Sequence, residues 1–208
     1  YVAITSTETF VGTAGETQIV DIVIGVDTKV EADETFEVSM FSLVPTTVAL
    51  SSIDTLDIGT VTILNDDSAA ITIADVSGNE DDGAITVSVS LDNAVQGGFT
   101  VDVSTADGTA TTSDEDYTAV LSETVSFSGA AGETQTFTVM PTADDKAEMD
   151  ETLTIVQSNL SGTTLGVTIT DEATITINND DFAPIVAAGQ IFTIDENSIK
   201  VKDILYTN

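Results

Sequence analysis

Apolar and polar residues alternate with a period of two along most of this chain. Residues 84–91 read Ala-Ile-Thr-Val-Ser-Val-Ser-Leu, so that Ile85, Val87 and Val89 fall on one side and hydroxyl side chains on the other. This pattern is typical of a strand with one buried face. The same alternation predicts further strands over residues 70–74, 99–103, 124–127, 136–139, 152–155 and 173–177.

Turn-forming residues separate these predicted strands, and no segment shows a sustained helical period with caps. The turn signals are Ser77-Gly78-Asn79, Gly97-Gly98, Asp107-Gly108, Gly129 to Gly132 and Ser161-Gly162. Short strands at this spacing predict an all-β fold, an antiparallel β-sandwich of the immunoglobulin-like size class. The phenylalanines expected in its cores are Phe10, Phe36, Phe127 and Phe137.

Part of the chain occurs twice. Gly15-Glu16-Thr17-Gln18 recurs 117 positions later as Gly132-Glu133-Thr134-Gln135, and the acidic segment that starts at Asp27 recurs at Asp144 with the same spacing. Asn65-Asp66-Asp67 recurs as Asn179-Asp180-Asp181 at a spacing of 114. Self-similarity at a fixed spacing indicates a modular array, and this spacing is about one domain. The sequence therefore predicts tandem β-sandwiches.

The repeat also predicts where the modules begin and end. Residues 68–181 form one complete sandwich, and residues 1–67 match only the C-terminal half of that unit. Residues 182–208 are predicted to be a linker and the start of a third β module. Because a half-sandwich would leave open edges and an uncovered core face, we expect the sequence to be part of a longer protein.

The charge is strongly one-sided, with 36 acidic residues against 4 basic ones and a net charge of −32. Such a polyanion lacks the basic surface that nucleic-acid binding needs and is repelled by anionic membranes. No apolar run approaches the roughly 18 residues of a membrane span. We therefore expect neither a nucleic-acid partner nor direct membrane insertion. The carboxylates either form a solvated surface, as in adaptation to high salt, or bind divalent cations that relieve their repulsion.

The absence of several residue types limits which metals the chain can bind and which reactions it can catalyse. The chain has no cysteine and no histidine, which excludes the usual ligands of zinc, haem iron and copper. It offers no pair of nucleophile and base. Paired carboxylates can hydrolyse glycosides, but that needs aromatic sugar platforms, and the chain has no tryptophan and only three tyrosines. We predict that the protein is not an enzyme and that any bound metal is held by oxygen.

The acids of the complete module fall at four predicted loops or strand ends. They are Glu80 to Asp82, Asp107 with residues 114–116, Asp144 to Glu151, and Asp180-Asp181. Loops gather at the two ends of a sandwich, so acids far apart in sequence can meet at one pole. Calcium takes six to eight oxygen ligands, many of them from carboxylates. This distribution favours Ca²⁺ over a merely solvated face.

These motifs, in their order and spacing, resemble the Calx-β domain family. The resemblance rests on Asp107-Gly108-Thr109-Ala110, Ser113 to Tyr117, Phe127, Gly132-Glu133-Thr134, Asp144 to Leu153 and Ile177 to Asp181. It implies an immunoglobulin-like sandwich that binds Ca²⁺ at one end, near the junction with the next domain. Ala143 and Asn179 stand where relatives often carry aspartate, which implies fewer or weaker sites. The ligands that the resemblance implies are Glu80, Asp107, Asp116, Asp144, Asp145, Glu148, Glu151, Asp180 and Asp181.

The other two modules add further candidate ligands. In the first copy, the matching acids are Asp27, Glu31, Glu34, Asp66 and Asp67. In the third, Phe192 to Asn197 is similar to the opening strands of a cadherin-like repeat, in which a glutamate helps to hold calcium between modules. That similarity makes Glu196 a candidate.

The function we expect is that of a calcium-binding, calcium-rigidified structural module in a large secreted or cell-surface protein, such as a bacterial adhesin or surface filament. Its partners are expected to be neighbouring domains of the same chain, with any cell-surface, protein or glycan ligand bound elsewhere in the full protein. Two alternatives remain open at this point. One is a regulatory calcium-sensor domain of a transporter, and the other is a spacer module of a secreted enzyme.

Overall fold

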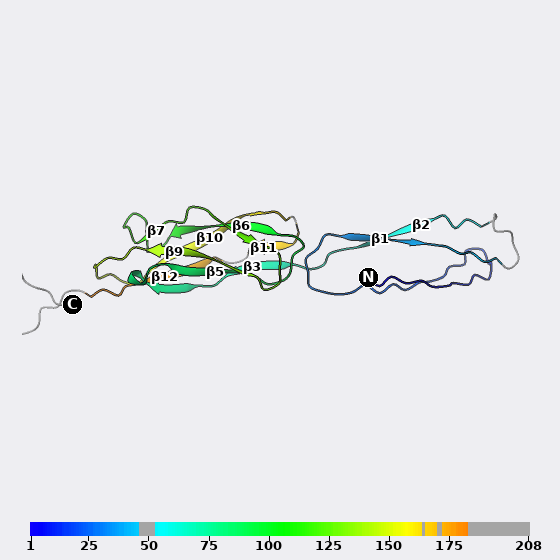
Figure 1. Ribbon diagram of the computed structural model, residues 1–208, viewed down its shortest axis with the longest axis horizontal. Coiled ribbons are helices and arrows are strands. Elements are labelled where there is room, and N and C mark those ends of the chain that lie inside the picture. Colours follow the sequence, from blue (N-terminus) through cyan, green and yellow to red (C-terminus); the bar gives the residue numbers. More distant parts are fainter. Residues whose placement is uncertain (46–52, 164, 170–171, 183–208) are drawn as a thin grey trace, which may run out of the picture.

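The computed structural model describes residues 1–45, 53–163, 165–169 and 172–182 (Figure 1). Residues 68–182 contain two five-stranded sheets packed face to face, which confirms the predicted all-β sandwich. One sheet has the order β4 (Val76–Asn79), β12 (Ala173–Asn178), β10 (Glu151–Ser161), β6 (Phe99–Asp107) and β8 (Glu123–Phe127). The other has the order β11 (Val167–Ile169), β3 (Ala69–Ile73), β5 (Ile85–Leu91), β9 (Thr134–Pro141) and β7 (Tyr117–Thr118).

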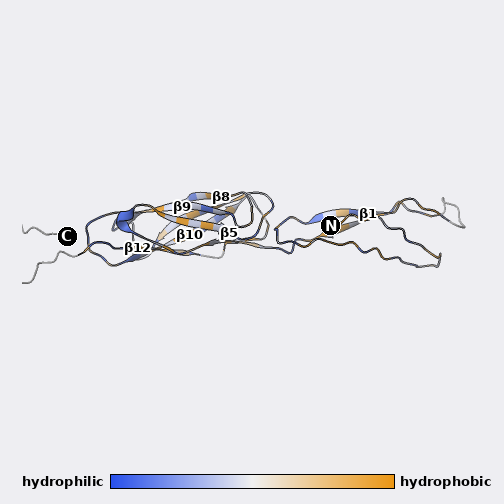
Figure 2. Ribbon diagram, turned by 60° about the horizontal axis from the view of Figure 1, so that its bottom comes forward, coloured by the Kyte–Doolittle hydropathy of each residue, from blue (hydrophilic) through white to orange (hydrophobic). Residues whose placement is uncertain are grey.

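The core lies between the inner faces of these two sheets. Strand β5 buries every second residue, with Val87 and Val89 fully inaccessible, as its alternation predicted. Apolar and polar colours alternate along this strand in Figure 2. From the opposite sheet, Phe99 stacks on Phe127 with ring centroids 5.1 Å apart. Because buried apolar area is the main favourable term in folding, this layer positions everything else in the module.

Three short strands, β4, β7 and β11, were not predicted, and one predicted turn was wrong. Ser77-Gly78-Asn79 belongs to β4, which pairs in parallel with β12. A Cβ atom at Gly78 would lie 2.7 Å from Ile85 Cγ1. The glycine is therefore explained by close packing of β4 against β5, and it does not mark a chain reversal.

The strand directions bring the acidic loops to one pole of the sandwich. Strands β4, β6, β9 and β12 all end there, and β5 and β10 begin there. A single 3₁₀ turn, η2 (Glu80–Asp82), follows β4 at this pole. The loops at residues 92–98 and 128–133 occupy the opposite pole. Among the described residues there is no α-helix, and none of their segments is a helix long and apolar enough to cross a membrane.

Residues 1–64 contain one strand pair, β1 (Glu34–Ser39) with β2 (Ile58–Ile63). Most of the large hydrophobic side chains that are exposed in the structure lie in this part of the chain. Phe36 is buried and stacks on Tyr1, as expected for a core residue, but Phe10 is 56% exposed, so that expectation was wrong. Its counterpart Phe127, by contrast, is buried and stacks on Phe99.

The repeated glutamate fastens the same turn in both copies. The carboxylate of Glu133 accepts hydrogen bonds from the N–H groups of Ser128 (2.9 Å), Gly129 (3.1 Å) and Ala130 (3.2 Å). Glu16 accepts the equivalent bonds from Val11, Gly12 and Thr13. Partial burial opposes ionisation of Glu133, but these donors outweigh it and lower its pKa to about 2. This glutamate is a structural residue.

We predict that Glu133→Gln lowers the free energy of unfolding by about 2 kcal/mol at pH 7, because several donors lose a charged acceptor. A carboxyl group with a lowered pKa stabilises the fold above its unfolded value and loses that contribution as the pH falls through the folded value. The difference between wild type and variant should therefore shrink between pH 4.5 and pH 2. Urea denaturation across this range measures it, and a difference independent of pH would contradict the assignment.

Candidate metal centre

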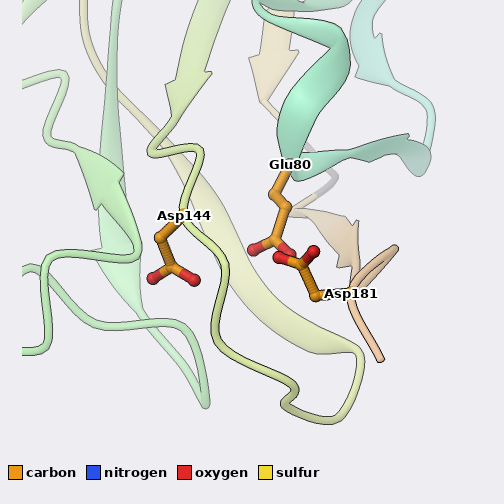
Figure 3. A group of neighbouring side chains, drawn as sticks. All are labelled: Glu80, Asp144 and Asp181. Atoms are coloured by element: carbon orange, nitrogen blue, oxygen red, sulfur yellow. The ribbon is translucent and has the colours of Figure 1, made fainter. Parts of the chain in front are cut away.

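Carboxylates from four loops meet at the acidic pole. Glu80, Asp144 and Asp181 each place an oxygen so that all three atoms lie within 4.8 Å of one another. Glu80 comes from η2, Asp144 from the loop between β9 and β10, and Asp181 from the segment after β12. Figure 3 shows the carboxylates of Glu80 and Asp181 facing each other, with Asp144 on the neighbouring loop. We call these three residues the first acidic group.

Three oxygen atoms at this pole are buried without a hydrogen-bond partner in the described structure. They are Glu80 Oε1, Asp180 Oδ1 and Asp181 Oδ2. Glu80 is only 6% exposed, and burial together with the charge of Asp144 raises the pKa of its carboxyl group. Burial, with Asp81 and Asp145 nearby, also raises the pKa of Asp181. Buried polar groups normally have partners, and unpaired buried charge is costly.

A second acidic group consists of Asp116, Glu148 and Glu151, whose oxygens also lie within 4.8 Å of one another. Burial, and then the charge of Asp116, raises the pKa of Glu151 to about 7. Lys146 pairs with Glu148 and is the only basic residue in a described ion pair at this pole. Residues of both groups line a single hollow, together with Thr142 and Asn179. Several carboxylates thus share one small space with little neutralising charge.

Asn179 holds the loops of the site in place. Its side-chain oxygen accepts from the N–H of Glu148 (3.0 Å), and its side-chain nitrogen donates to the carbonyl of Asp181 (2.7 Å). Its own N–H donates to Asp150 Oδ1 (3.1 Å). From the sequence, Asn179 was interpreted only as a missing aspartate. The sequence does contain an indication that Asn179 positions the loops, because asparagine also occupies the matching place, Asn65, in the first copy.

Not every predicted ligand of the complete module belongs to one of the two acidic groups. Asp107 accepts hydrogen bonds from the hydroxyl of Tyr117 (2.6 Å) and the N–H of Thr112 (3.2 Å), and it lies in neither group. Asp145 and Asp180 lie in neither group, although their charges act on Asp181. For Asp107, Asp145 and Asp180, the role of calcium ligand stays a prediction. Glu196 lies outside the described residues.

The first copy repeats the framework of the site. Lys29 pairs with Glu31 at 2.6 Å, and the N–H of Glu31 donates to Asn65 Oδ1 at 2.9 Å. The side chain of Asn65 donates to the carbonyl of Asp67 at 2.9 Å. Burial, followed by the charges of Asp66, Asp27 and Glu31, raises the pKa of Asp67, so these acids are near neighbours. Glu34 begins β1, just as Glu151 begins β10.

The residues of this pole fit calcium. All available donors are oxygens, several come from carboxylates, and some are buried without a partner. Calcium prefers such oxygens and tolerates irregular coordination, whereas zinc and copper select histidine or cysteine. Burial, and then repulsion from neighbouring carboxylates, raises the pKa values of Glu80, Glu151 and Asp181, and a divalent cation would offset both effects.

Comparison with known proteins identifies the class. The Calx-beta domain family model matches residues 65–181, more than half of the chain. The chain therefore belongs to the Calx-β family, as its motifs predicted, and it carries a calcium-binding module of that family.

Similar solved structures include domains of Calx proteins. The apo form of the Calx CBD1 domain is 25% identical, with a TM-score of 0.48, and the match covers 55% of this chain and 100% of that one. CBD12 from CALX1.2 is 26% identical, with a TM-score of 0.47, and the match covers 54% of this chain and 46% of that one. The calcium-binding domain CBD12 of CALX1.1 is 26% identical, with a TM-score of 0.46 and coverages of 53% and 46%. No curated protein matches the chain.

We predict that Glu80→Gln changes stability in opposite directions with and without calcium. In chelator, the variant should melt at a higher temperature than wild type, because it removes a buried charge that has an unpartnered oxygen. In millimolar calcium the order should reverse, because a ligand is lost. Thermal melting in both conditions measures this. The matched control is Glu123→Gln on the exposed start of β8, which should change neither melt. A Glu80→Gln melt that shifts the same way in both conditions would contradict a cation at this site.

Proposed function

We propose that this chain is a calcium-stiffened segment of a large secreted or cell-surface protein, of the adhesin or surface-filament kind. The observation that supports the calcium part is the convergence of Glu80, Asp144 and Asp181, with Glu80 buried and one of its oxygens unpartnered. The proposed stiffening of the chain is supported by the first copy. Its acidic loop is held by the Asn65–Glu31 hydrogen bond, the counterpart of Asn179–Glu148, and it contacts the complete module through the Val30–Val95 bridge.

The two acidic groups would hold separate ions. Glu80, Asp144 and Asp181 would bind one, with Asp180 and Asp145 close by, and Asp116, Glu148 and Glu151 would bind another. Backbone carbonyls and water complete a calcium shell when carboxylates are too few. In the first copy, Asp27, Glu31, Glu34, Asp66 and Asp67 would contribute in the same way. A bound ion supplies positive charge where loops with like charge meet, and the loops can then hold one arrangement.

The setting we propose is extracellular. Extracellular modules bind calcium with dissociation constants of about 0.1 to 1 mM, so millimolar calcium would fill the sites. At a 100-fold excess over the dissociation constant, one ion adds about 2.7 kcal/mol to the stability. Neighbouring modules of the same chain are the proposed partners, and any adhesive ligand would bind elsewhere in the protein. In this role the module has no catalytic task.

Calorimetric titration of the full chain with calcium tests the proposal. We expect a dissociation constant of about 0.1 to 1 mM and a melting temperature that rises with calcium. Glu148→Ala should weaken binding, because it removes a member of the second acidic group, whereas Glu133→Ala should leave the affinity unchanged. Absence of binding heat, with the same melt in chelator, would overturn the proposal. A dissociation constant below about 1 μM would favour a regulatory sensor, since sensor sites bind in that range.

The site also predicts how stability depends on pH without calcium. The pKa of Glu151 is raised to about 7, first by burial and then by Asp116. A raised pKa means that the protonated form stabilises the fold below the unfolded value of 4.5 and that this contribution is lost as the pH rises through 7. In chelator, the melting temperature should fall by about 5 °C between pH 5 and pH 8. Saturating calcium should abolish that fall, because the ion replaces the proton.

The control for this pH series is Glu151→Gln, which keeps the shape of the side chain without its charge. Its melting temperature in chelator should depend much less on pH between 5 and 8. Calcium affinity of the wild type should also decrease from pH 8 to pH 6, because ligands must be deprotonated to bind. An affinity that stays constant over this range would contradict a role for Glu151 as a ligand.

A further inference from the structure

Basic residues are rare in this chain, and the described ones occupy equivalent places beside a candidate calcium ligand. The chain has 4 basic residues against 36 acidic ones. Two of them lie in the described part, Lys29 in the first copy and Lys146 in the complete module, 117 positions apart. Each forms an ion pair with the glutamate two residues later, Glu31 or Glu148. The recurrence of this pair indicates that the lysine has a task at this place.

The main chain fixes each lysine between two acids. The N–H of Lys146 donates to Asp144 Oδ1 (2.6 Å), while its ammonium group pairs with Glu148. Asp144 belongs to the first acidic group and Glu148 to the second. Lys146 therefore contacts both groups, one through its backbone and the other through its side chain. In the first copy, the N–H of Lys29 donates to Asp27 Oδ1 (2.9 Å) in the same way.

The charge of Lys146 acts on the acids around it. The hydrogen bond to Glu148, with the charges of Asp144 and Asp116 nearby, raises the pKa of Lys146. In turn, the positive charge of Lys146 lowers the pKa of Glu151, against the larger effects of burial and of the neighbouring carboxylates. The lysine thus already supplies part of the positive charge that a bound cation would bring to this pole.

The two partners of the ion pair differ in exposure. The side chain of Lys146 is 63% exposed and that of Glu148 is 18% exposed. An exposed ammonium group on a flexible stem can turn into water at little cost, whereas Glu148 is held in the site by the bond between its N–H and Asn179 (3.0 Å). A metal ion on the carboxylate of Glu148 would lie beside the ammonium group, and like charges repel. The ion pair therefore has to open before Glu148 can serve as a ligand.

We propose that Lys146 is a tethered counter-ion of the second acidic group, which pairs with Glu148 in the absence of calcium and is displaced when calcium binds. Lys29 has the same role at Glu31 in the first copy. Each lysine lowers the calcium affinity of its own site and stabilises the acidic loop of the metal-free protein. This inference rests on the proposed function, because it assigns a competitor to the same calcium sites.

Calcium titration of the full chain, followed by NMR at the amides of Glu31 and Glu148, tests each lysine separately. Lys146→Gln should lower the calcium concentration at the midpoint of the Glu148 titration about fivefold, because an exposed ion pair contributes up to about 1 kcal/mol. The Glu31 midpoint should not change, since the first copy contacts the opposite pole of the module. Lys29→Gln should have the reverse effect, so each variant is the matched control for the other.

Two further measurements distinguish competition from a purely structural role. Lys146→Arg keeps the charge and should bind calcium no more tightly than wild type. In chelator, Lys146→Gln should melt below wild type, because the acids lose a positive neighbour, and saturating calcium should remove that deficit. The gain in affinity of Lys146→Gln should also shrink between about 20 mM and about 500 mM salt, because salt screens exposed charges.

The outcomes separate this inference from the proposed function. An unchanged or weaker calcium affinity of Lys146→Gln, in conditions where the wild type binds calcium, would overturn the role of the lysine and leave the proposed function standing. A calcium response in neither the wild type nor the variants would overturn both.

Discussion

Repulsion among carboxylates held at one pole is the constraint on which the rest of this structure depends. At the end of the sandwich there are two groups of three acids, and within each group the carboxylate oxygens lie within 4.8 Å of one another. Among the described residues, one lysine forms an ion pair there. The apolar core and the ladders of the two sheets hold the strand ends in place, so the acids cannot separate without disrupting the fold. Asn179 then fixes the loops between them. The module stores this unfavourable electrostatic energy at the place where a cation can relieve it.

The same type of side chain serves two opposite purposes in this protein. Glu133 is surrounded by N–H donors, which stabilise its charge and lower its pKa to about 2. Glu151 is buried beside another carboxylate, and its pKa rises to about 7. The first arrangement is satisfied by the protein itself and fastens a turn. The second is satisfied only by a proton or a metal ion, which distinguishes a structural acid from a candidate ligand.

The alternation of residues predicted the long, central strands of the sandwich well, because each buries every second side chain. It missed β7 and β11, which have two and three residues and are too short to show a period. It also missed β4, because Gly78 looks like a turn residue until its contact with Ile85 is known.

For the site, the sequence predicted which loops carry the acids but not how they group. The orientation of Asp107 depends on its hydrogen bond with Tyr117. The role of Asn179 depends on how closely the segment after β12 approaches the loop that contains Glu148. Both are set by how the loops close, which local sequence does not specify. The repeat was the most informative signal, because Asn65 and Asn179 mark the same framework.

Val30 of the first copy is hydrogen-bonded to residues 94–96 of the complete module, and these bonds are formed by main-chain groups. This affects how far the sequences of joined modules can change. Hydrogen bonds to Ala94 and Gln96 use groups that every residue except proline provides. The restricted positions are glycines: Gly129, where a Cβ atom would lie 2.3 Å from Val95 O, and Gly97 and Gly98 in the loop itself. Modules connected in this way can exchange most of their surface side chains while the hydrogen bonds that join one module to the next are kept.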